Sequence, residues 1–237
     1  MPSRTAIAFT LTAIACWLSD EFVRQKTKLL LGTAIYSSFG EEMGTKILSH
    51  QVPLGTFVAE LRDFPESAFN GTEQIAGFLR RTPVVPDTLA PYLTWDRQHY
   101  TRNLIDKTPL YELIAICWEV GQASSVHNHR DQNCWMTVPM GRLLVENFRV
   151  ISEELQRGQC RLAPAESVEM NPACPCAVDP LQPVHRVCNP REFNQRAVSL
   201  HVYSRPFDSC VVYSPEQGTC GEIKLHYTTE YGKPVKV

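Results

Sequence analysis

Residues 121–141 read GQASSVHNHRDQNCWMTVPMG, with two histidines one residue apart and a cysteine five residues after the second. If this segment is extended, His127 and His129 point to the same face, because side chains alternate along a strand. Two imidazoles on one face, about 6–7 Å apart along the strand, can chelate one metal ion. A helix would place such a pair three or four residues apart. The stretch therefore predicts a strand that offers two metal ligands.

The chain from Leu110 onward is typical of β-structure. Short segments rich in Val, Ile, Leu and aromatic residues are separated by Gly, Pro, Asn and Ser; they include ELIAICWEV (112–120), RLLVENFRV (142–150), VHRVCN (184–189), AVSLHVYS (197–204), SCVVYS (209–214) and GEIKLHY (221–227). This spacing predicts an antiparallel all-β sandwich or barrel that begins at about residue 110. The sequence contains no alternating βα pattern and no glycine-rich phosphate loop, which argues against a nucleotide-binding α/β domain.

The region in front of these strands has a helical pattern. In VPLGTFVAELRDF (52–64), apolar residues recur at spacings of three and four, as on one face of a helix. In NGTEQIAGFLRRTP (70–83), Thr72 is a suitable N-cap and Pro83 ends the pattern,. We therefore expect N-terminal helices over residues 52–93.

Residues 1–50 are expected to be an N-terminal extension of uncertain structure, and residues 51–237 to be the single domain. The uncharged run TAIAFTLTAIACW (5–17) is too short to span a bilayer as a helix, which needs about 20 residues. Two interpretations stay open: a buried or amphipathic helix, or a targeting segment within residues 1–20. We expect a cytoplasmic protein with no membrane span.

Composition limits the possible partners. The chain has 237 residues and a net charge of −2 at pH 7, so nothing in it attracts nucleic acid. Hydrophobic residues make up 43% of it, which suits a globular protein with a core. Nine cysteines are too few for a small disulfide scaffold of this length. Their spacing does not match paired zinc knuckles.

Two motifs in the sequence resemble those of the cupin superfamily. The first consists of Gly121, His127, His129, Cys134 and Gly141, with cysteine where most members carry glutamate. The second, PVHRVCN over residues 183–189, supplies His185 and Asn189. The resemblance implies a mainly β, double-sheet barrel with a metal in its mouth. Because the acidic ligand is absent, the implied site has three neutral imidazoles, which suit Fe, Zn, Cu or Ni and leave coordination positions open.

The chain looks most like the thiol dioxygenases within that superfamily, in particular the animal type of cysteine dioxygenase. The matching stretches lie between about Pro53 and Tyr231; they are HYTRNLID (99–106), ICWEVGQASSVHNHRDQNC (116–134), VHRVCN (184–189) and AVSLHVYSRPFDSC (197–210). The resemblance implies Fe(II) held by His127, His129 and His185. It also implies a small thiol and O2 as partners, with L-cysteine oxidised to cysteine sulfinic acid. We expect a monomer.

The same resemblance implies roles for further residues. Arg102 would bind the substrate carboxylate beside Tyr100, and arginine suits a planar carboxylate better than lysine does. Cys134 and Tyr203 would form a thioether cross-link near the iron. Ser199 and His201 would form a hydrogen-bonded relay with the same tyrosine.

The alternation in AVSLHVY (197–203) supports the relay independently. On a strand, its valines and leucine face a core, while Ser199, His201 and Tyr203 share the opposite face and line a polar cavity. A hydroxyl, an imidazole and a phenol on one face can form a directional chain of hydrogen bonds.

The sequence departs from the animal enzymes at Arg205, which stands where they carry proline after a cis peptide bond. A cis bond is rarer before a residue other than proline, so the loop either differs here or keeps a cis bond before arginine. Arg205 is also a candidate second cation for the substrate. It keeps 3-mercaptopropionate and mercaptosuccinate open as substrates. Two further functions stay open: a non-enzymatic metal-binding cupin, and a cupin enzyme that uses zinc or nickel.

Overall fold

The computed structural model describes residues 51–172, 174, 176–177 and 184–235, all within a compact unit that spans Ile47–Val237. The expected extension over residues 1–50, with its two open interpretations, lies outside the described residues. The domain boundary near residue 50 stays a prediction. Within the described part of the chain, no helix is long and apolar enough to cross a membrane.

Short helices precede the strands, as the helical pattern predicted. They are α1 (Leu54–Arg62), η1 (Glu66–Phe69), α2 (Glu73–Arg81) and η2 (Pro86–Tyr92). Buried residues of the two α-helices pack into one core; they are Leu54, Phe57 and Leu61 on α1, at helical spacing, and Ile75, Ala76, Phe78 and Leu79 on α2. Thr72 directly precedes α2 but makes no side-chain capping bond. Its carbonyl instead accepts a hydrogen bond of 2.8 Å from the Trp135 indole.

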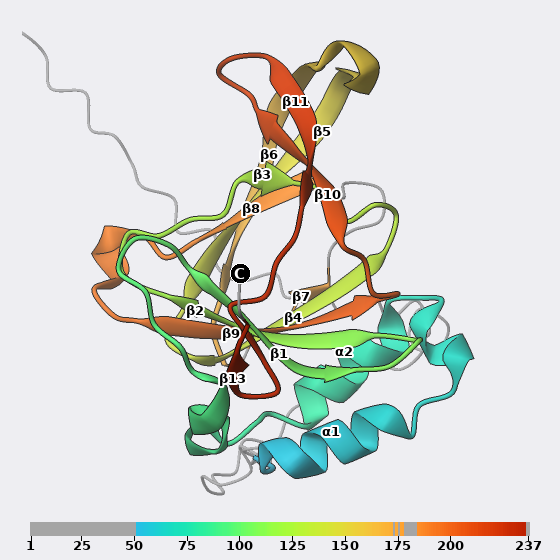
Figure 1. Ribbon diagram of the computed structural model, residues 1–237, viewed down its shortest axis with the longest axis vertical. Helices are drawn as coiled ribbons and strands as arrows, with labels where there is room; N and C mark the ends of the chain where they lie inside the picture. The colour runs from blue at the N-terminus through green and yellow to red at the C-terminus, as the bar shows by residue number, and fades with distance from the viewer. Residues whose placement is uncertain (1–50, 173, 175, 178–183, 236–237) are drawn as a thin grey trace, which may run out of the picture. The chain divides into compact units, whose positions relative to one another are not determined.

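The strands form two sheets (Figure 1). One sheet has the order β13-β12-β1-β2-β9-β4-β7, and the other is a closed ring in the order β10-β11-β6-β5-β8-β3. The first contains β1 (Thr101–Lys107), β2 (Glu112–Trp118), β4 (Asn133–Met140), β7 (Cys176–Ala177), β9 (Ala197–Ser204), β12 (Thr229–Glu230) and β13 (Lys233–Pro234). The second contains β3 (Val126–His127), β5 (Leu143–Glu154), β6 (Gln159–Met170), β8 (Val184–Cys188), β10 (Ser209–Ser214) and β11 (Thr219–Lys224). This mainly β, double-sheet architecture confirms the predicted fold class.

The alternation along β9 separates two cores. Val198, Leu200 and Val202 pack into the cluster that contains the helices. Tyr203, on the opposite face of the strand, belongs to a second cluster that joins both sheets. The polar residues of β9 therefore face the space between the sheets, as the period-two pattern predicted.

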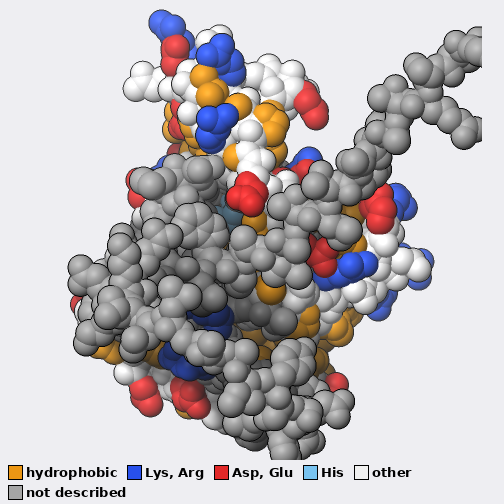
Figure 2. All heavy atoms as spheres, turned by 180° about the vertical axis from the view of Figure 1, so that it is seen from behind, with side chains coloured by type: hydrophobic (Ala, Val, Ile, Leu, Met, Phe, Trp, Pro, Cys, Tyr) orange, Lys and Arg blue, Asp and Glu red, His pale blue; other side chains and the backbone are white. Residues whose placement is uncertain are grey.

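The β5–β6 and β10–β11 hairpins project together from the second sheet, at the top of Figure 1. In the view from behind, the same end carries basic and acidic side chains interspersed with apolar ones (Figure 2). Val150 and Ile151 are among the exposed apolar residues of β5. Charged side chains along projecting strands oppose edge-to-edge pairing with another chain.

Candidate metal centre

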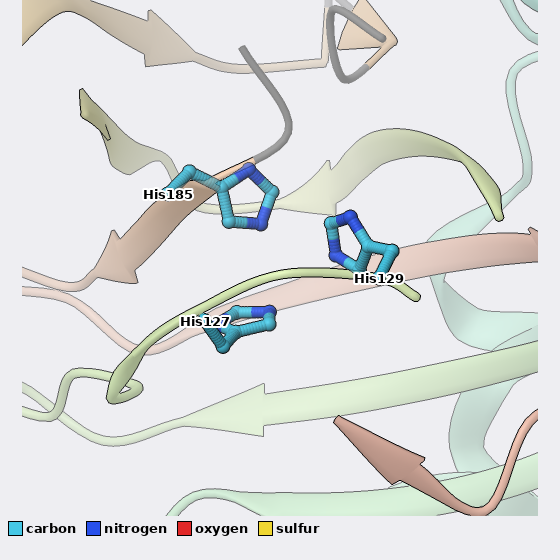
Figure 3. A group of neighbouring side chains, drawn as sticks. All are labelled: His127, His129 and His185. Carbon is cyan, nitrogen blue, oxygen red and sulfur yellow. The ribbon is translucent and has the colours of Figure 1, made fainter. Parts of the chain in front are cut away.

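Three histidines converge where β3 and β8 meet (Figure 3). His127 ends β3 and lies directly opposite His185 of β8 in the antiparallel register. His129 follows two residues later, beyond the end of the strand. The imidazole centroids lie 4.9 Å apart for His127 and His185, 5.1 Å for His127 and His129, and 4.8 Å for His129 and His185. The strand is shorter than predicted, because it ends at His127. The side chains of His127 and His129 nevertheless meet at the same site.

Asn128 explains why the backbone keeps its direction beyond β3. Its N–H donates to the carbonyl of Val211 at 3.1 Å, and its side-chain oxygen accepts from the Val211 N–H at 3.1 Å. Its amide nitrogen also donates to the Tyr213 hydroxyl at 3.2 Å. The residue between the two histidines is therefore held against β10, which leaves both imidazoles facing the interior.

The hydrogen bonds at the site favour metal ligation. The Nδ1 of His127 lies 2.9 Å from the carbonyl oxygen of Ser125. A carbonyl only accepts, so Nδ1 carries the proton and Nε2 keeps its lone pair for a ligand. Both ring nitrogens of His129 and His185 are buried without a hydrogen-bond partner among the described residues. Buried polar atoms without partners are costly, and a bound cation would satisfy one lone pair on each ring.

Burial also keeps the three imidazoles neutral. It lowers the pKa of His127 to about 4. It lowers the pKa of His129 and His185 well below the usual range, and the neighbouring histidines add to the effect. Neutral imidazole is the metal-binding form. Ligand atoms of the three residues lie within 4.8 Å of one another, the one such group found in the described part of the chain. The site therefore fits a divalent cation held by three neutral nitrogens.

A hydrogen-bonded chain runs along β9 beside the histidines. The Ser199 hydroxyl lies 2.8 Å from Nε2 of His201, and Nδ1 of His201 lies 3.0 Å from the Tyr203 hydroxyl. The Trp118 indole N–H donates to Ser199 at 2.9 Å. Each of these side chains is buried. The structure therefore brings together the three residues that the alternation placed on one face.

Cys134 of β4 is the direct cross-strand neighbour of Tyr203 on β9. Both side chains are buried. Burial raises the pKa of the Tyr203 phenol well above its usual range, and Cys134 contributes to the rise. Residues that face each other in an antiparallel pair have Cβ atoms about 4.5–5.5 Å apart. The two side chains are placed for a bond, and the thioether itself stays a prediction.

A cavity opens in front of the histidines. Two of the predicted substrate-binding residues, Tyr100 and Arg102, line it together with His127, His129, His201 and Tyr203. The Tyr100 ring stacks on Trp118, with centroids 4.7 Å apart. The Arg102 Nε is buried without a hydrogen-bond partner among the described residues. The cavity thus presents a cation in addition to His127 and His129.

Apolar side chains that the sequence analysis did not single out complete the wall of the cavity; they include Phe207, Val212, Ile223 and Leu225. Phe207 packs its edge against the Tyr203 ring, with centroids 5.2 Å apart. The aromatic residue in SRPFDSC was a usable signal, since it lies in a stretch that matches the thiol dioxygenases. Ile223 and Leu225 carried no such signal, because an apolar residue on a strand more often packs into a core.

Arg205 does not line the cavity. Its guanidinium forms an ion pair with Glu66 of η1, and its backbone N–H donates to the Gln132 side chain. The peptide bond between Ser204 and Arg205 is cis, which is one of the two outcomes considered from the sequence. The proposed second cation therefore points toward η1 rather than toward the histidines.

The chain is similar to known proteins. The family model "Cysteine dioxygenase type I" matches residues 43–216. Cysteine dioxygenase type 1 of Danio rerio is 29% identical over 182 residues, which cover 76% of this chain and 88% of the relative. The Homo sapiens protein of that name is 27% identical over 161 residues, 68% of this chain and 78% of the relative. Among solved structures, a double-stranded β-helix protein from Klebsiella pneumoniae covers 49% of this chain and 80% of its own, at 16% identity and a TM-score of 0.36.

Proposed function

The chain belongs to the cysteine dioxygenase type I family, and from this premise we propose that it oxidises L-cysteine with O2 to cysteine sulfinic acid, with Fe(II) as its cofactor. The observation that supports this most directly is that Arg102 lines the same cavity as His127 and His129, two members of the three-histidine cluster. We assign the activity to the domain over residues 51–237.

The metal ligands in this proposal are His127, His129 and His185. When bound, Fe(II) would favour the thiolate form of the substrate and bring it together with O2. Nitrogen ligands of this kind suit several transition metals, so the choice of iron rests on the family. The three imidazoles leave coordination positions open on the cavity side, where the substrate would enter.

Arg102 would fix the substrate carboxylate. Its Nε is buried without a partner among the described residues, and a buried donor without a hydrogen-bond partner is unfavourable. A carboxylate accepts two parallel hydrogen bonds from a guanidinium. Such a pair would orient an amino-acid thiol with its sulfur toward the histidines. The apolar wall formed by Phe207, Val212 and Leu225 would exclude water around it.

The Tyr203 hydroxyl would donate a hydrogen bond into the cavity. The Trp118 indole can only donate, so Ser199 accepts from it and has its own O–H free for His201. His201 then carries its proton on Nδ1 and donates to the phenol oxygen. With these proton positions, every hydrogen bond between Trp118, Ser199, His201 and Tyr203 has one donor and one acceptor. The phenol O–H is then available to the substrate or O2. A thioether to Cys134 would hold the ring in that orientation.

The placement of Arg205 supports a monocarboxylic thiol. A dicarboxylic thiol such as mercaptosuccinate would need a second cation in the cavity to pair with its second carboxylate. The Arg205 guanidinium is paired with Glu66 instead. Cysteine and 3-mercaptopropionate each carry a single carboxylate, which matches the single guanidinium of the site, and the family match favours cysteine.

The experiment is an oxygen-uptake assay on Fe(II)-loaded protein with L-cysteine, 3-mercaptopropionate and mercaptosuccinate, with the products identified by mass spectrometry. We expect sulfinate from cysteine at the highest kcat/KM. If cysteine gives no sulfinate while another thiol does, the assignment of L-cysteine as the substrate is wrong. Metal binding without oxygen uptake for any thiol would instead indicate a non-enzymatic cupin. Full activity with zinc or nickel, measured after iron removal, would overturn the iron assignment.

A further inference from the structure

The projecting hairpins carry the same three-residue pattern twice. In Gly158-Gln159-Cys160 the glycine directly precedes β6, and in Gly218-Thr219-Cys220 the glycine directly precedes β11. The two segments run antiparallel and side by side, with Gln159 directly opposite Thr219. Figure 1 shows the ends of the two hairpins meeting at the top of the second sheet. A local two-fold axis through the Gln159–Thr219 pair therefore relates the two segments to each other.

This register places each cysteine opposite a glycine. The Cys160 N–H donates to the carbonyl of Gly218 at 2.9 Å, and the Cys220 N–H donates to the carbonyl of Gly158 at 3.0 Å. The two cysteines flank the central pair, so their side chains share the face opposite to Gln159 and Thr219. No side chain stands between them on that face, because both residues opposite are glycine.

Both sulfur atoms lean toward the centre of this arrangement. The Cys160 thiol donates to the carbonyl of Thr219 at 3.1 Å, and the Cys220 thiol donates to the carbonyl of Gln159 at 3.3 Å. Each sulfur thus lies against the residue next to the other cysteine. Burial raises the pKa of the Cys160 thiol, and direct interaction with the Cys220 thiol raises it further. The two thiols are therefore diagonal neighbours with a clear path between them.

We propose that Cys160 and Cys220 are a redox-active dithiol that closes to a disulfide by exchange with small-molecule disulfides and ties β6 to β11. In the first step, one cysteine thiolate attacks the small disulfide, forms a mixed disulfide and releases one small thiol. In the second step, the other cysteine attacks the protein sulfur of that mixed disulfide and releases the second small thiol. The pair gives up two protons and two electrons, and the small disulfide takes them up to become two thiols.

The surroundings determine which cysteine reacts first. Cys220 is partly exposed, while Cys160 is 8% exposed. The buried thiol is the weaker first attacker because less of it is ionised. We therefore assign the mixed disulfide to Cys220 and the closing step to Cys160.

The bond would link β6 and β11 covalently where few backbone pairs join the two strands. Between β6 and β11, Gln159 and Thr219 form the one register pair that the structure shows in the described residues. β11 continues into Ile223 and Leu225, which line the cavity. The disulfide would link positions 60 residues apart, and cross-links across long loops stabilise by restricting the unfolded chain. We expect the melting temperature to rise by about 5–10 °C on oxidation.

The test is to incubate the reduced full-length protein with oxidised glutathione and map its cysteines by mass spectrometry without reduction. We expect a linked peptide pair that contains Cys160 and Cys220, no retained glutathione on either, and loss of the link with dithiothreitol. Reversal by dithiothreitol separates this bond from a thioether, which persists. A linked pair made of other cysteines, or no linked pair, would overturn the proposal.

Three variants sharpen the test. Cys160→Ser should retain one glutathione on Cys220, because the closing thiol is missing. Cys220→Ser should show neither the link nor the rise in melting temperature. Cys188→Ser is the matched control, since Cys188 is a partly buried thiol that bonds to Glu146 elsewhere on the sheet; it should behave as wild type. If wild-type protein keeps glutathione on Cys220 and forms no disulfide to Cys160, the proposed pairing of the two cysteines is refuted, even if every variant folds. The proposal is independent of the dioxygenase activity, which this test does not measure.

Discussion

Cys134 and Tyr203 face each other directly across the ladder between β4 and β9. The side chains lie in one buried cluster that also receives residues from the second sheet. The phenol lies against His129, with ring centroids 5.6 Å apart. A tether between these two residues would therefore hold the phenol beside the metal ligands rather than bring it there from a distance.

Replacing Cys134 should lower turnover without removing the metal. In Cys134→Ala the tyrosine keeps its bond to His201 but loses the tether, so we expect kcat to fall by roughly ten-fold, the equivalent of about 1.4 kcal/mol of transition-state stabilisation. Metal content should stay near one per chain. Intact-mass analysis of the wild type should show a species about 2 Da lighter than the encoded chain, from loss of two hydrogens. The encoded mass throughout, after turnover and reduction, would remove the thioether from the proposal.

His185→Ala should abolish stoichiometric metal binding. The other two imidazoles come from one short segment, and His185 is the ligand that closes the site from β8. Two ligands hold a divalent ion far less tightly than three. Metal analysis after dialysis checks this, with His226→Ala as the matched control, because His226 is exposed and lies outside the cluster. Retention of one metal per chain in His185→Ala would break the ligand assignment.

A site residue can be predicted from the sequence when its position depends only on neighbouring residues in the same segment. The His127–His129 pair and the Ser199–His201–Tyr203 face need only the alternation of side chains along a chain segment. His185 is 58 residues from His127, and its role came from resemblance to a second motif. The sequence could not predict where the Arg205 side chain points, because this depends on its contact with Glu66, which is 139 residues away on a 3-10 helix. The Cys160–Cys220 pair likewise requires the register between β6 and β11, which neither G-x-C segment encodes alone.

Arg102→Gln should raise KM for carboxylated thiols. Loss of a bidentate, charge-assisted pair costs about 2–3 kcal/mol, so kcat/KM for cysteine should fall by roughly 30–150-fold. Cysteamine, which has the amine and thiol but no carboxylate, should be affected far less. Arg205→Gln is the control, and we expect it to change kcat/KM by less than about two-fold because its guanidinium is paired with Glu66,. An equal loss with cysteamine would show that Arg102 does not act on the carboxylate.

Trp118→Phe tests the direction of the hydrogen-bonded chain. The substitution keeps an aromatic ring for Tyr100 to stack on and removes the N–H that donates to Ser199. Without that donor, the serine proton can turn away from His201, and the phenol is oriented less firmly. We expect kcat to fall by about three- to ten-fold, since one neutral hydrogen bond is worth about 0.5–1.5 kcal/mol. Metal content and KM for cysteine should stay near the wild-type values. An unchanged kcat would show that the indole only packs against Tyr100.

The metal-free protein should lose stability as the pH falls below about 6.5. Burial lowers the pKa of His127 to about 4 and of His201 to about 3, and holds those of His129 and His185 well below the usual range. Unfolded histidine titrates near 6.5, so in this window the unfolded chain binds protons that the folded chain does not. The free energy of unfolding then decreases with falling pH, by up to about 1.4 kcal/mol per pH unit for each histidine.

Urea unfolding with a chelator at pH 7.5 and pH 5.5 measures this effect. His226→Gln should keep the full pH dependence, because that histidine is exposed. His201→Gln should weaken the dependence, since one buried imidazole no longer has to stay neutral. If the unfolding midpoint of the metal-free wild type is the same at both pH values, the folded protein does not hold these four imidazoles neutral. The same outcome would undermine the neutral three-histidine ligand set on which the proposed metal centre depends.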